Sequence, residues 1–191
     1  MNTLLFASQN KHKIKEIQSV LEGSYIIKSL QDVGFSGELE EPFDTFTENA
    51  KTKAKQGYDI FNLPCFAEDA GLVIEALEGR PGVLSARYAG NNKDPQANID
   101  KVLQEMQGDA NRNAYFIAVI AYYSGTGYHL FEGRINGTIL DQRAGDGGFG
   151  YDPIFMPDGY YQSFGELGDE VKSKISHRSI AARQFISFLK K

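Results

Sequence analysis

The feature that most constrains the fold of this chain is a long run of apolar and aromatic residues at Ala114–Tyr123. Its length and composition predict the clearest β-strand of the chain. Shorter apolar runs predict further strands at residues 4–7, 25–30, 65–67, 72–76, 129–135 and 138–142. Because strands alternate with helices early in the chain and gather in its middle, we predict a mixed α/β fold.

Capping residues and helical spacing predict helices at residues 10–21, 45–55, 94–107 and 179–189. Asn10 can cap the first helix, because its short amide side chain accepts hydrogen bonds from the first turn. Thr45 and Glu48 form a capping box for the second helix, and Asp94–Pro95 suits the start of the third.

The chain has 191 residues and a formal net charge of −5, with one cysteine, Cys65. This length suits a single domain, residues 1–191, whose core needs no disulfide or metal to hold it together. The acidic balance argues against nucleic acid as a partner, since proteins that bind it are usually basic. We recognise no signal peptide and no membrane-spanning run, and a lone cysteine suits a reducing compartment. We therefore expect a cytoplasmic location without membrane contact.

A cluster of positive charge follows the first predicted strand, in the segment Ser8–Lys13. The first turn of a helix already carries positive partial charge, so lysines there are unfavourable unless an anion is bound. The Ser8 hydroxyl, the Asn10 amide, backbone N–H groups and the Lys13 ammonium together could hold phosphate oxygens. The segment lacks the glycines of a Walker A loop, and an ordinary capped helix is the alternative.

Two adjacent carboxylates, Glu68 and Asp69, lie between the two strands predicted at residues 65–67 and 72–76. Ionised carboxylates in such a place are costly unless they are paired or bound to a metal. Oxygen ligands suit magnesium, which often bridges to phosphate groups. An acidic turn at the end of a strand is the alternative. A second carboxylate ligand would come from the acidic residues Glu40, Glu41, Asp44 and Glu48.

The glycine-rich segment 144–153 is predicted to be a loop. It formally fits a dinucleotide-binding fingerprint, but Pro153 opposes the helix that this fingerprint requires. Its glycines would instead let the backbone approach a flat group, with Phe149 or Tyr151 stacked on a base. A plain glycine-rich turn is the alternative.

Three hydrogen-bond donors, Lys172, His177 and Arg178, precede the last predicted helix. They could donate to carbonyl oxygens of a ligand, and surface or capping roles are the alternative. Cys65 is predicted to pack in the core, since no base that would activate a nucleophile is evident near it in the sequence.

Taken in chain order, these segments resemble the inosine/xanthosine triphosphate pyrophosphatase family, hydrolases of deaminated purine nucleotides. The blocks that carry the resemblance are residues 8–16 (SQNKHKIKE), 45–54 (TFTENAKTKA), 69–90, 148–155 (GFGYDPIF) and 172–178 (KSKISHR). The family usually has Asp-Asp-Ser-Gly where this chain has Glu68–Gly71, so a hydroxyl is missing at Ala70. The chain also departs at residues 40–44, where the common Glu-Thr-Gly pattern is absent.

The resemblance implies an elongated mixed sheet with flanking helices and two lobes around a central nucleotide cleft, usually in a homodimer. It implies hydrolysis of the triphosphates of inosine, deoxyinosine and xanthosine (ITP, dITP and XTP) to the monophosphate and pyrophosphate, with Mg²⁺ as cofactor. Asp69 is the implied catalytic residue, as metal ligand, as base or as both, and Glu41 is the candidate second metal ligand. The residues implied in substrate binding are Ser8, Gln9, Asn10, Lys11, His12, Lys13, Lys53, Ala70, Phe149, Gly150, Tyr151, Asp152, Lys172, His177 and Arg178.

Base selection follows from the edge that each purine presents. Hypoxanthine and xanthine have an acceptor oxygen at C6, where adenine has a donor amino group. Donors from Lys172, His177 or Arg178 would pair with that oxygen and reject adenine. Two other functions stay open: a related pyrophosphatase of the Maf type that prefers other or modified bases, and a regulatory module that binds nucleotides without catalysis.

Overall fold

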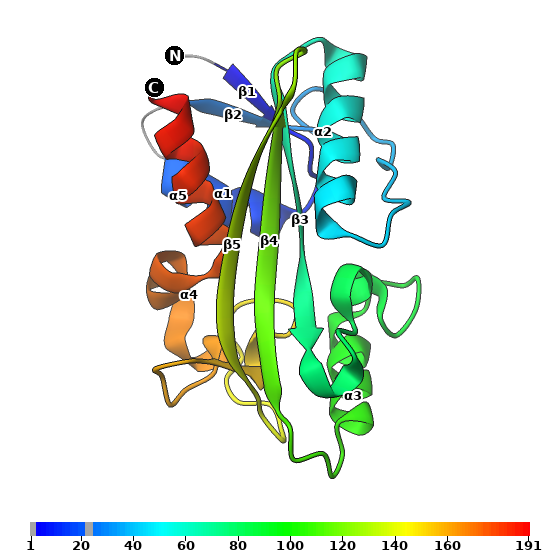
Figure 1. The fold of residues 1–191 in the computed structure, drawn as a ribbon, viewed down its shortest axis with the longest axis vertical. Helices are drawn as coiled ribbons and strands as arrows, with labels where there is room; N and C mark the ends of the chain where they lie inside the picture. Colours follow the sequence, from blue (N-terminus) through cyan, green and yellow to red (C-terminus); the bar gives the residue numbers. More distant parts are fainter. Residues whose placement is uncertain (1–2, 22–24) are drawn as a thin grey trace. The chain divides into compact units, whose positions relative to one another are not determined.

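The computed structural model describes residues 3–21 and 25–191, which form a mixed α/β fold (Figure 1). The strands form a six-stranded sheet in the order β2–β1–β3–β4–β5–β6. Strand β1 pairs in parallel with β2 and β3, whereas β5 and β6 are antiparallel, so the sheet is mixed as the sequence predicts. The strands are β1 (Thr3–Phe6), β2 (Ile26–Ser29), β3 (Cys65–Ile74), β4 (Asn113–Tyr123), β5 (Tyr128–Ile139) and β6 (Phe155–Pro157).

The α-helices are α1 (Lys11–Leu21), α2 (Phe46–Phe61), α3 (Pro95–Glu105), α4 (Phe164–Ile175) and α5 (His177–Leu189). The predicted starts of α1, α2 and α3 are confirmed by their N-cap hydrogen bonds. Asn10 Oδ1 accepts from the backbone N–H groups of His12 and Lys13. The side chains of Thr45 and Asp94 accept from backbone N–H groups in the first turns of α2 and α3. Within the described ranges, every helix is too short or too polar to cross a bilayer.

The chain divides into two compact units. Unit 1 comprises Met1–Asp69, Ala118–Gly133 and Arg178–Lys191, and unit 2 comprises Ala70–Ile117 and Arg134–His177. The strands β3, β4 and β5 contribute residues to both units. Each unit therefore needs its own set of core side chains.

Aromatic rings and one close helix–strand contact form the core of unit 1. Phe66 stacks on Phe6, with ring centroids 4.6 Å apart, and packs on Phe185 of α5 at 4.9 Å. In Figure 1, α2 (cyan) and α5 (red) flank the strands of this unit. Gly57 lets α2 approach β3, because a Cβ at this position would lie 2.5 Å from Cys65 Sγ. The prediction that Cys65 packs in the core is confirmed.

The core of unit 2 lies under α3. Ile99 and Val102 of this helix and its C-cap residue Met106 are buried. They pack with aromatic side chains that include Phe116 of β4 and Phe155 of β6.

Several predicted boundaries are wrong. The segment Glu68–Gly71 does not separate two strands, because β3 runs without interruption from Cys65 to Ile74. The ion pairs described below compensate the two carboxylates, so the strand can continue through them. The two strands predicted at 129–135 and 138–142 form one strand, β5. Gly137 of β5 lets β6 approach closely, because a Cβ at this position would lie 2.3 Å from the carbonyl oxygen of Met156.

Helix α2 extends to Phe61 instead of ending near residue 55, and Asn62 closes it with a left-handed φ of 51°. Strand β6 and helix α4 were not predicted. A capping box between Ser163 and Glu166 begins α4, and this sequence signal was available. The final helix begins at His177, two residues before the predicted start at Ser179.

Candidate functional site

The first candidate site is a group of charged side chains in unit 1, hereafter the charged cluster. Helices α1, α2 and α5, strand β3 and the segment before α2 supply its members, which are all buried or partly buried. The members are Lys13, Glu16, Glu41, Lys53, Glu68, Asp69 and Arg178.

Lys53 joins the two carboxylates that the sequence proposes as metal ligands. Its Nζ donates to Glu41 Oε1 and lies 3.3 Å from Asp69 Oδ1. It also donates to the backbone carbonyl of Glu68 at 2.8 Å, which fixes it to β3. The other oxygen of Asp69 accepts from Asn49 Nδ2 at 3.3 Å. Helix α2 therefore holds Asp69 through an ammonium and an amide one turn apart.

Burial and opposite charge set the proton affinities in this group. Desolvation raises the pKa of Asp69 above its usual value, although Lys53 and Lys13 act in the other direction. Burial acts to lower the pKa of Lys53, but the charges of Asp69 and Glu41 outweigh it, so the net shift is upward. Desolvation and the neighbouring ammonium groups therefore act on the Asp69 pKa in opposite directions, and desolvation prevails.

Arg178 links α5 to β3 and α1. It is buried, and its Nε and Nη2 donate to Glu68 Oε2 and Oε1 at 2.6 and 2.8 Å. Its Nη1 donates to Glu16 Oε2 at 2.5 Å. Burial acts to lower the pKa of Arg178, but the carboxylates of Glu68 and Glu16 raise it overall. Glu68 is thus bound by a planar fork of donors, a strong and orienting arrangement.

Lys13 stands at the edge of the charged cluster. Its Nζ lies 3.5 Å from Glu68 Oε1, and its side chain is 17% exposed, so solvent or a ligand can reach it. Desolvation lowers the pKa of Lys13, and Glu68 opposes that shift. The ammonium is therefore close to one carboxylate, at the end of a side chain that is partly exposed.

The rest of the predicted phosphate segment makes local bonds. Asn10 Oδ1 accepts from the backbone of His12 and Lys13, and Ser8 Oγ accepts from the backbone of Asn10. Gln9 Nε2 donates to the carbonyl of Gly37 at 2.9 Å and also to that of Phe35. Lys11 and His12 are exposed. These bonds rigidify the turn before α1 and fix the direction in which Lys13 leaves the helix.

The donor set of the charged cluster bears on the predicted magnesium. Among residues 3–21 and 25–191, no three His, Cys, Asp or Glu side chains form a group able to hold a metal ion by themselves. Glu41 and Asp69 nevertheless converge on one ammonium, and a pair of carboxylates suits magnesium when waters and phosphate oxygens complete its shell. In their ionised forms the cluster members carry one more negative than positive charge. The residues therefore fit a divalent cation that binds together with an anionic substrate.

The second candidate site lies in unit 2, at the glycine-rich segment. Asp152 is buried, and its Oδ2 accepts from Lys172 Nζ at 2.6 Å and from the backbone N–H of Phe149 at 2.7 Å. The Lys172 ammonium lies 4.4 Å from the centroid of the Phe149 ring. Gly148 has a φ of 75°, and a Cβ there would lie 2.1 Å from Asp152 Oδ2. One carboxylate therefore holds both the loop and the lysine.

The other predicted residues of unit 2 have identifiable environments. The Tyr151 hydroxyl donates to the carbonyl of Ser85 at 2.8 Å, and burial raises the pKa of Tyr151. The ring of His177 stacks on Phe116 with centroids 4.9 Å apart. Gly150 and Ala70 are partly buried. Unit 2 thus brings Phe149, Asp152 and Lys172 together, whereas Arg178 belongs to the charged cluster of unit 1.

Two side chains that contact predicted site residues, Glu16 and Asn49, were not among the candidates. Glu68 was considered together with Asp69 as a carboxylate that needs a partner or a metal, and its partner proves to be Arg178. Glu16 and Asn49 lie inside the blocks that carry the resemblance, at positions three residues after Lys13 and four before Lys53. Helical spacing places residues three or four apart on one face, and this signal could have found them.

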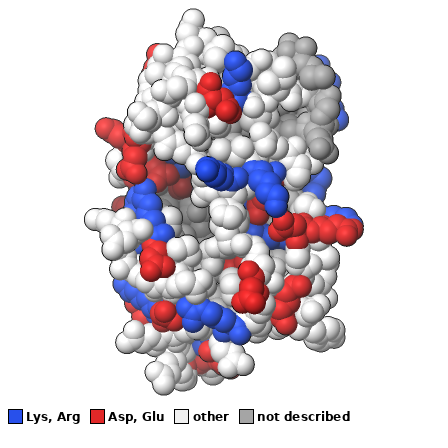
Figure 2. All heavy atoms as spheres, turned by 180° about the vertical axis from the view of Figure 1, so that it is seen from behind, with Lys and Arg blue, Asp and Glu red and all other residues white. Residues whose placement is uncertain are grey.

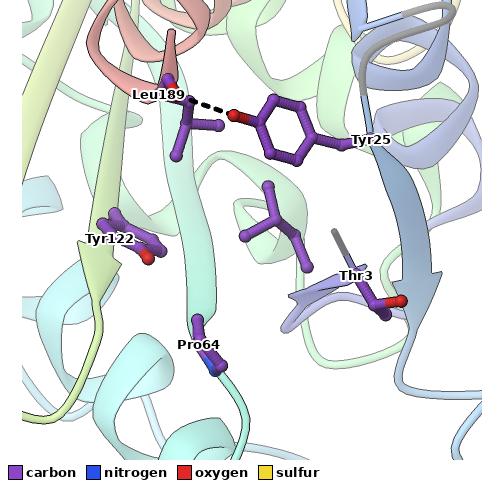
Figure 3. Close-up of a pocket in the computed structure, with 6 residues that line it drawn as sticks. Thr3, Tyr25, Pro64, Tyr122 and Leu189 are labelled. Atoms are coloured by element: carbon purple, nitrogen blue, oxygen red, sulfur yellow. Dashed lines mark hydrogen bonds between the residues drawn. The ribbon is translucent and has the colours of Figure 1, made fainter. Parts of the chain in front are cut away.

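Other surface features of the molecule are separate from the charged cluster. Figure 2 shows Lys and Arg side chains lying among Asp and Glu side chains on one face. A pocket of about 390 Å³ in unit 1 is lined by Thr3, Leu4, Tyr25, Pro64, Tyr122 and Leu189 (Figure 3). Tyr25 donates there to the carbonyl of Leu189. This pocket contains no member of the charged cluster.

The fold and the charged cluster define an α/β protein with a carboxylate–lysine site. Residues 4–188 match the Ham1 family, and the chain belongs to that family. It is 45% identical over 190 residues to a dITP/XTP pyrophosphatase of Porphyromonas gingivalis, covering 99% of this chain and 98% of that protein. It is 42% identical to a dITP/XTP pyrophosphatase of Bacillus subtilis, over 99% of this chain and 98% of that protein. The structure of the Staphylococcus aureus Ham1 protein superposes with a TM-score of 0.91 at 35% identity, covering 99% and 98% of the two chains.

Proposed function

We propose that this protein hydrolyses ITP, dITP and XTP to the nucleoside monophosphate and pyrophosphate, and so removes deaminated purines from the nucleotide pool. The observation that carries the proposal is the Glu41–Lys53–Asp69 group, in which Lys53 and Asp69 are buried and Glu41 is partly buried, in a chain that matches a dITP/XTP pyrophosphatase over 99% of its length. A triphosphate carries roughly four negative charges near neutral pH, and cations must offset them before a nucleophile can attack phosphorus.

We propose that Asp69 and Glu41 bind Mg²⁺ together with the substrate. Magnesium bound there would neutralise phosphate oxygens and orient the leaving pyrophosphate. The excess negative charge of the charged cluster supports this proposal, because the cluster alone would repel a triphosphate. Lys13 and Lys53 supply the remaining positive charge from the protein, and the turn Ser8–Lys13 directs Lys13 toward the phosphates.

Asp69 is the proposed base. It takes a proton from water, whose oxygen forms a bond to the α-phosphorus while the bond to the bridging oxygen breaks. The electron pair of that bond leaves with pyrophosphate. Lys53 holds Asp69 in place through the ion pair at 3.3 Å, and Asn49 orients its second oxygen. The upward direction of the Asp69 pKa supports a role as proton acceptor.

From the resemblance, we propose the residues that contact the purine ring of the substrate. Phe149 would stack on the purine, with Gly150, Tyr151 and Asp152 shaping its loop. Lys172 and His177 would donate to the C6 oxygen, which adenine lacks. The proposed homodimer and cytoplasmic location rest on the resemblance and on the lone Cys65.

A substrate panel tests the proposal. The purified chain, with and without Mg²⁺, is given ITP, dITP, XTP, GTP and ATP, and the products are separated as monophosphate, pyrophosphate and phosphate. We expect pyrophosphate from the first three nucleotides and little from ATP. Preference for other or modified bases would favour a pyrophosphatase of the Maf type. The absence of turnover with all five nucleotides would favour a regulatory module that binds nucleotides without catalysis.

The variant Asp69→Asn tests the proposed base. It keeps the shape of the side chain and removes its charge and its ability to accept a proton. We expect kcat for ITP to fall at least about 100-fold, with nucleotide affinity changed by a modest factor. Asp59→Asn, at an exposed acid of α2 outside the charged cluster, is the matched control and should retain activity. Full turnover by Asp69→Asn would remove Asp69 from the chemistry.

A further inference from the structure

We propose that Arg178 is a positioning residue for the phosphate end of the site, and that it acts on Lys13 through Glu68. This inference rests on the proposed function. It differs from the role that the resemblance implies for Arg178, which is direct donation to the purine base.

The contacts of Arg178 carry the argument. Its Nε, Nη1 and Nη2 each donate to a carboxylate, two to Glu68 and one to Glu16, at 2.5–2.8 Å. All three acceptors belong to unit 1, where Arg178 itself is placed. A guanidinium held by two carboxylates from different elements has one orientation, since its donors are fixed in a plane.

Glu68 lies between Arg178 and Lys13, so the orientation of Arg178 fixes the carboxylate that Lys13 faces. Its side chain is fully buried, and the two bonds from Arg178 fix both of its oxygens. The same Oε1 that accepts from Arg178 lies 3.5 Å from Lys13 Nζ. Glu68 therefore sets where the Lys13 ammonium rests, while the separation leaves that ammonium able to turn toward an incoming phosphate.

Helix α1 carries both Lys13 and Glu16, the second carboxylate that binds Arg178. Lys13 and Glu16 lie three residues apart and share one face of this helix. Arg178 binds Glu16 directly and faces Lys13 through Glu68, so it fixes the helix face from which Lys13 extends. The Glu68 of this chain, where the resembled family usually has Asp, supplies the longer side chain that makes these contacts.

The experiment measures binding of inorganic tripolyphosphate by titration calorimetry at one fixed Mg²⁺ concentration, the same for every variant. This probe has no base and needs no turnover. Arg178→Lys keeps the charge and removes the planar fork, and we expect its Kd to rise about tenfold, as for other residues that orient a ligand-binding group. Arg183→Lys is the matched control, an exposed arginine on the same helix, and its Kd should stay within about twofold of wild type.

A double-mutant cycle separates positioning from a general loss of structure. In a Lys13→Ala background, Arg178→Lys should change the Kd less than about twofold, because the residue through which Arg178 acts is gone. An equal loss in both backgrounds, an unchanged Kd in Arg178→Lys, or no tripolyphosphate binding by wild type would overturn the inference.

Glu16→Gln covers the case in which Arg178→Lys does not fold. It removes a negative charge, so electrostatics alone would tighten tripolyphosphate binding, whereas lost positioning weakens it. Tighter binding would therefore contradict the inference. ITP hydrolysis is assayed in parallel: turnover without the Lys13–Arg178 coupling refutes only this inference, and coupling without turnover refutes only the proposed function.

Discussion

The contact between Gly57 and Cys65 determines how closely the helix that carries Lys53 approaches the strand that carries Asp69. Replacing Gly57 by alanine would place a methyl group 2.5 Å from Cys65 Sγ and 3.4 Å from the Cβ of Ala7. Overpacking of this kind costs about 1–3 kcal/mol, and the better helix propensity of alanine returns about 1 kcal/mol. We therefore expect Gly57→Ala to lower the free energy of unfolding by about 1 kcal/mol.

The sulfur atom is the main obstacle, so its removal should rescue the variant. Cys65→Ala alone leaves a small void and is destabilising. In the double variant the new methyl occupies the space of the sulfur, and the next neighbours, Ala7 Cβ and Cys65 Cβ, are 3.4 and 3.7 Å away. We expect the double variant to be more stable than the sum of the two single changes predicts, by about 1 kcal/mol.

Urea unfolding followed by circular dichroism gives the three free energies. A change of 1 kcal/mol corresponds to a Tm shift of about 2–4 °C in a chain of this size. Additive single changes would refute the reasoning, because they would show that α2 moves away from β3 at no cost. In that case, the distance between Lys53 and Asp69 would not depend on this contact.

Further predictions concern other buried groups. Burial raises the pKa of the Cys65 thiol to about 12, so at pH 8 the thiolate is scarce, and iodoacetamide should alkylate Cys65 only as fast as the protein unfolds. Lys172→Met leaves the Asp152 carboxylate buried without its ammonium, and urea unfolding should show a loss of about 3 kcal/mol; an unchanged midpoint would contradict the buried ion pair. Gly148→Ala strains a left-handed residue against Asp152 and displaces Phe149, so the ratio of kcat/KM for ITP over ATP should fall while tripolyphosphate binding is retained.

Local signals in the sequence were sufficient where the chain makes local bonds. Asn10, Thr45 and Asp94 cap helices through hydrogen bonds to residues two or three positions away, and these starts are correct. The prediction failed at Glu68–Gly71 and at Gly137, where distant partners allow a strand to continue. Arg178 is 110 residues from Glu68, and no local pattern shows that it will neutralise that carboxylate.

In the candidate site, too, the residue types could be predicted from the sequence, whereas the contacts between distant residues could not. Lys13, Lys53, Glu41 and Asp69 were proposed from residue type and resemblance, and the structure places all four in one charged cluster. What sequence could not supply is which acid pairs with which base. That choice depends on the packing of α5 against β3 and on the buried guanidinium of Arg178, both of which are set by tertiary contacts.

The uninterrupted course of β3 has a consequence for its two acids. Neighbouring residues of a strand point to opposite faces, so Glu68 turns toward the helices that carry Lys13 and Arg178, and Asp69 turns toward the helix that carries Lys53. The peptide backbone thus separates a carboxylate committed to a guanidinium from one that can exchange its partner. Deleting one residue upstream in β3 would exchange these two surroundings and leave each acid facing the cations of the other.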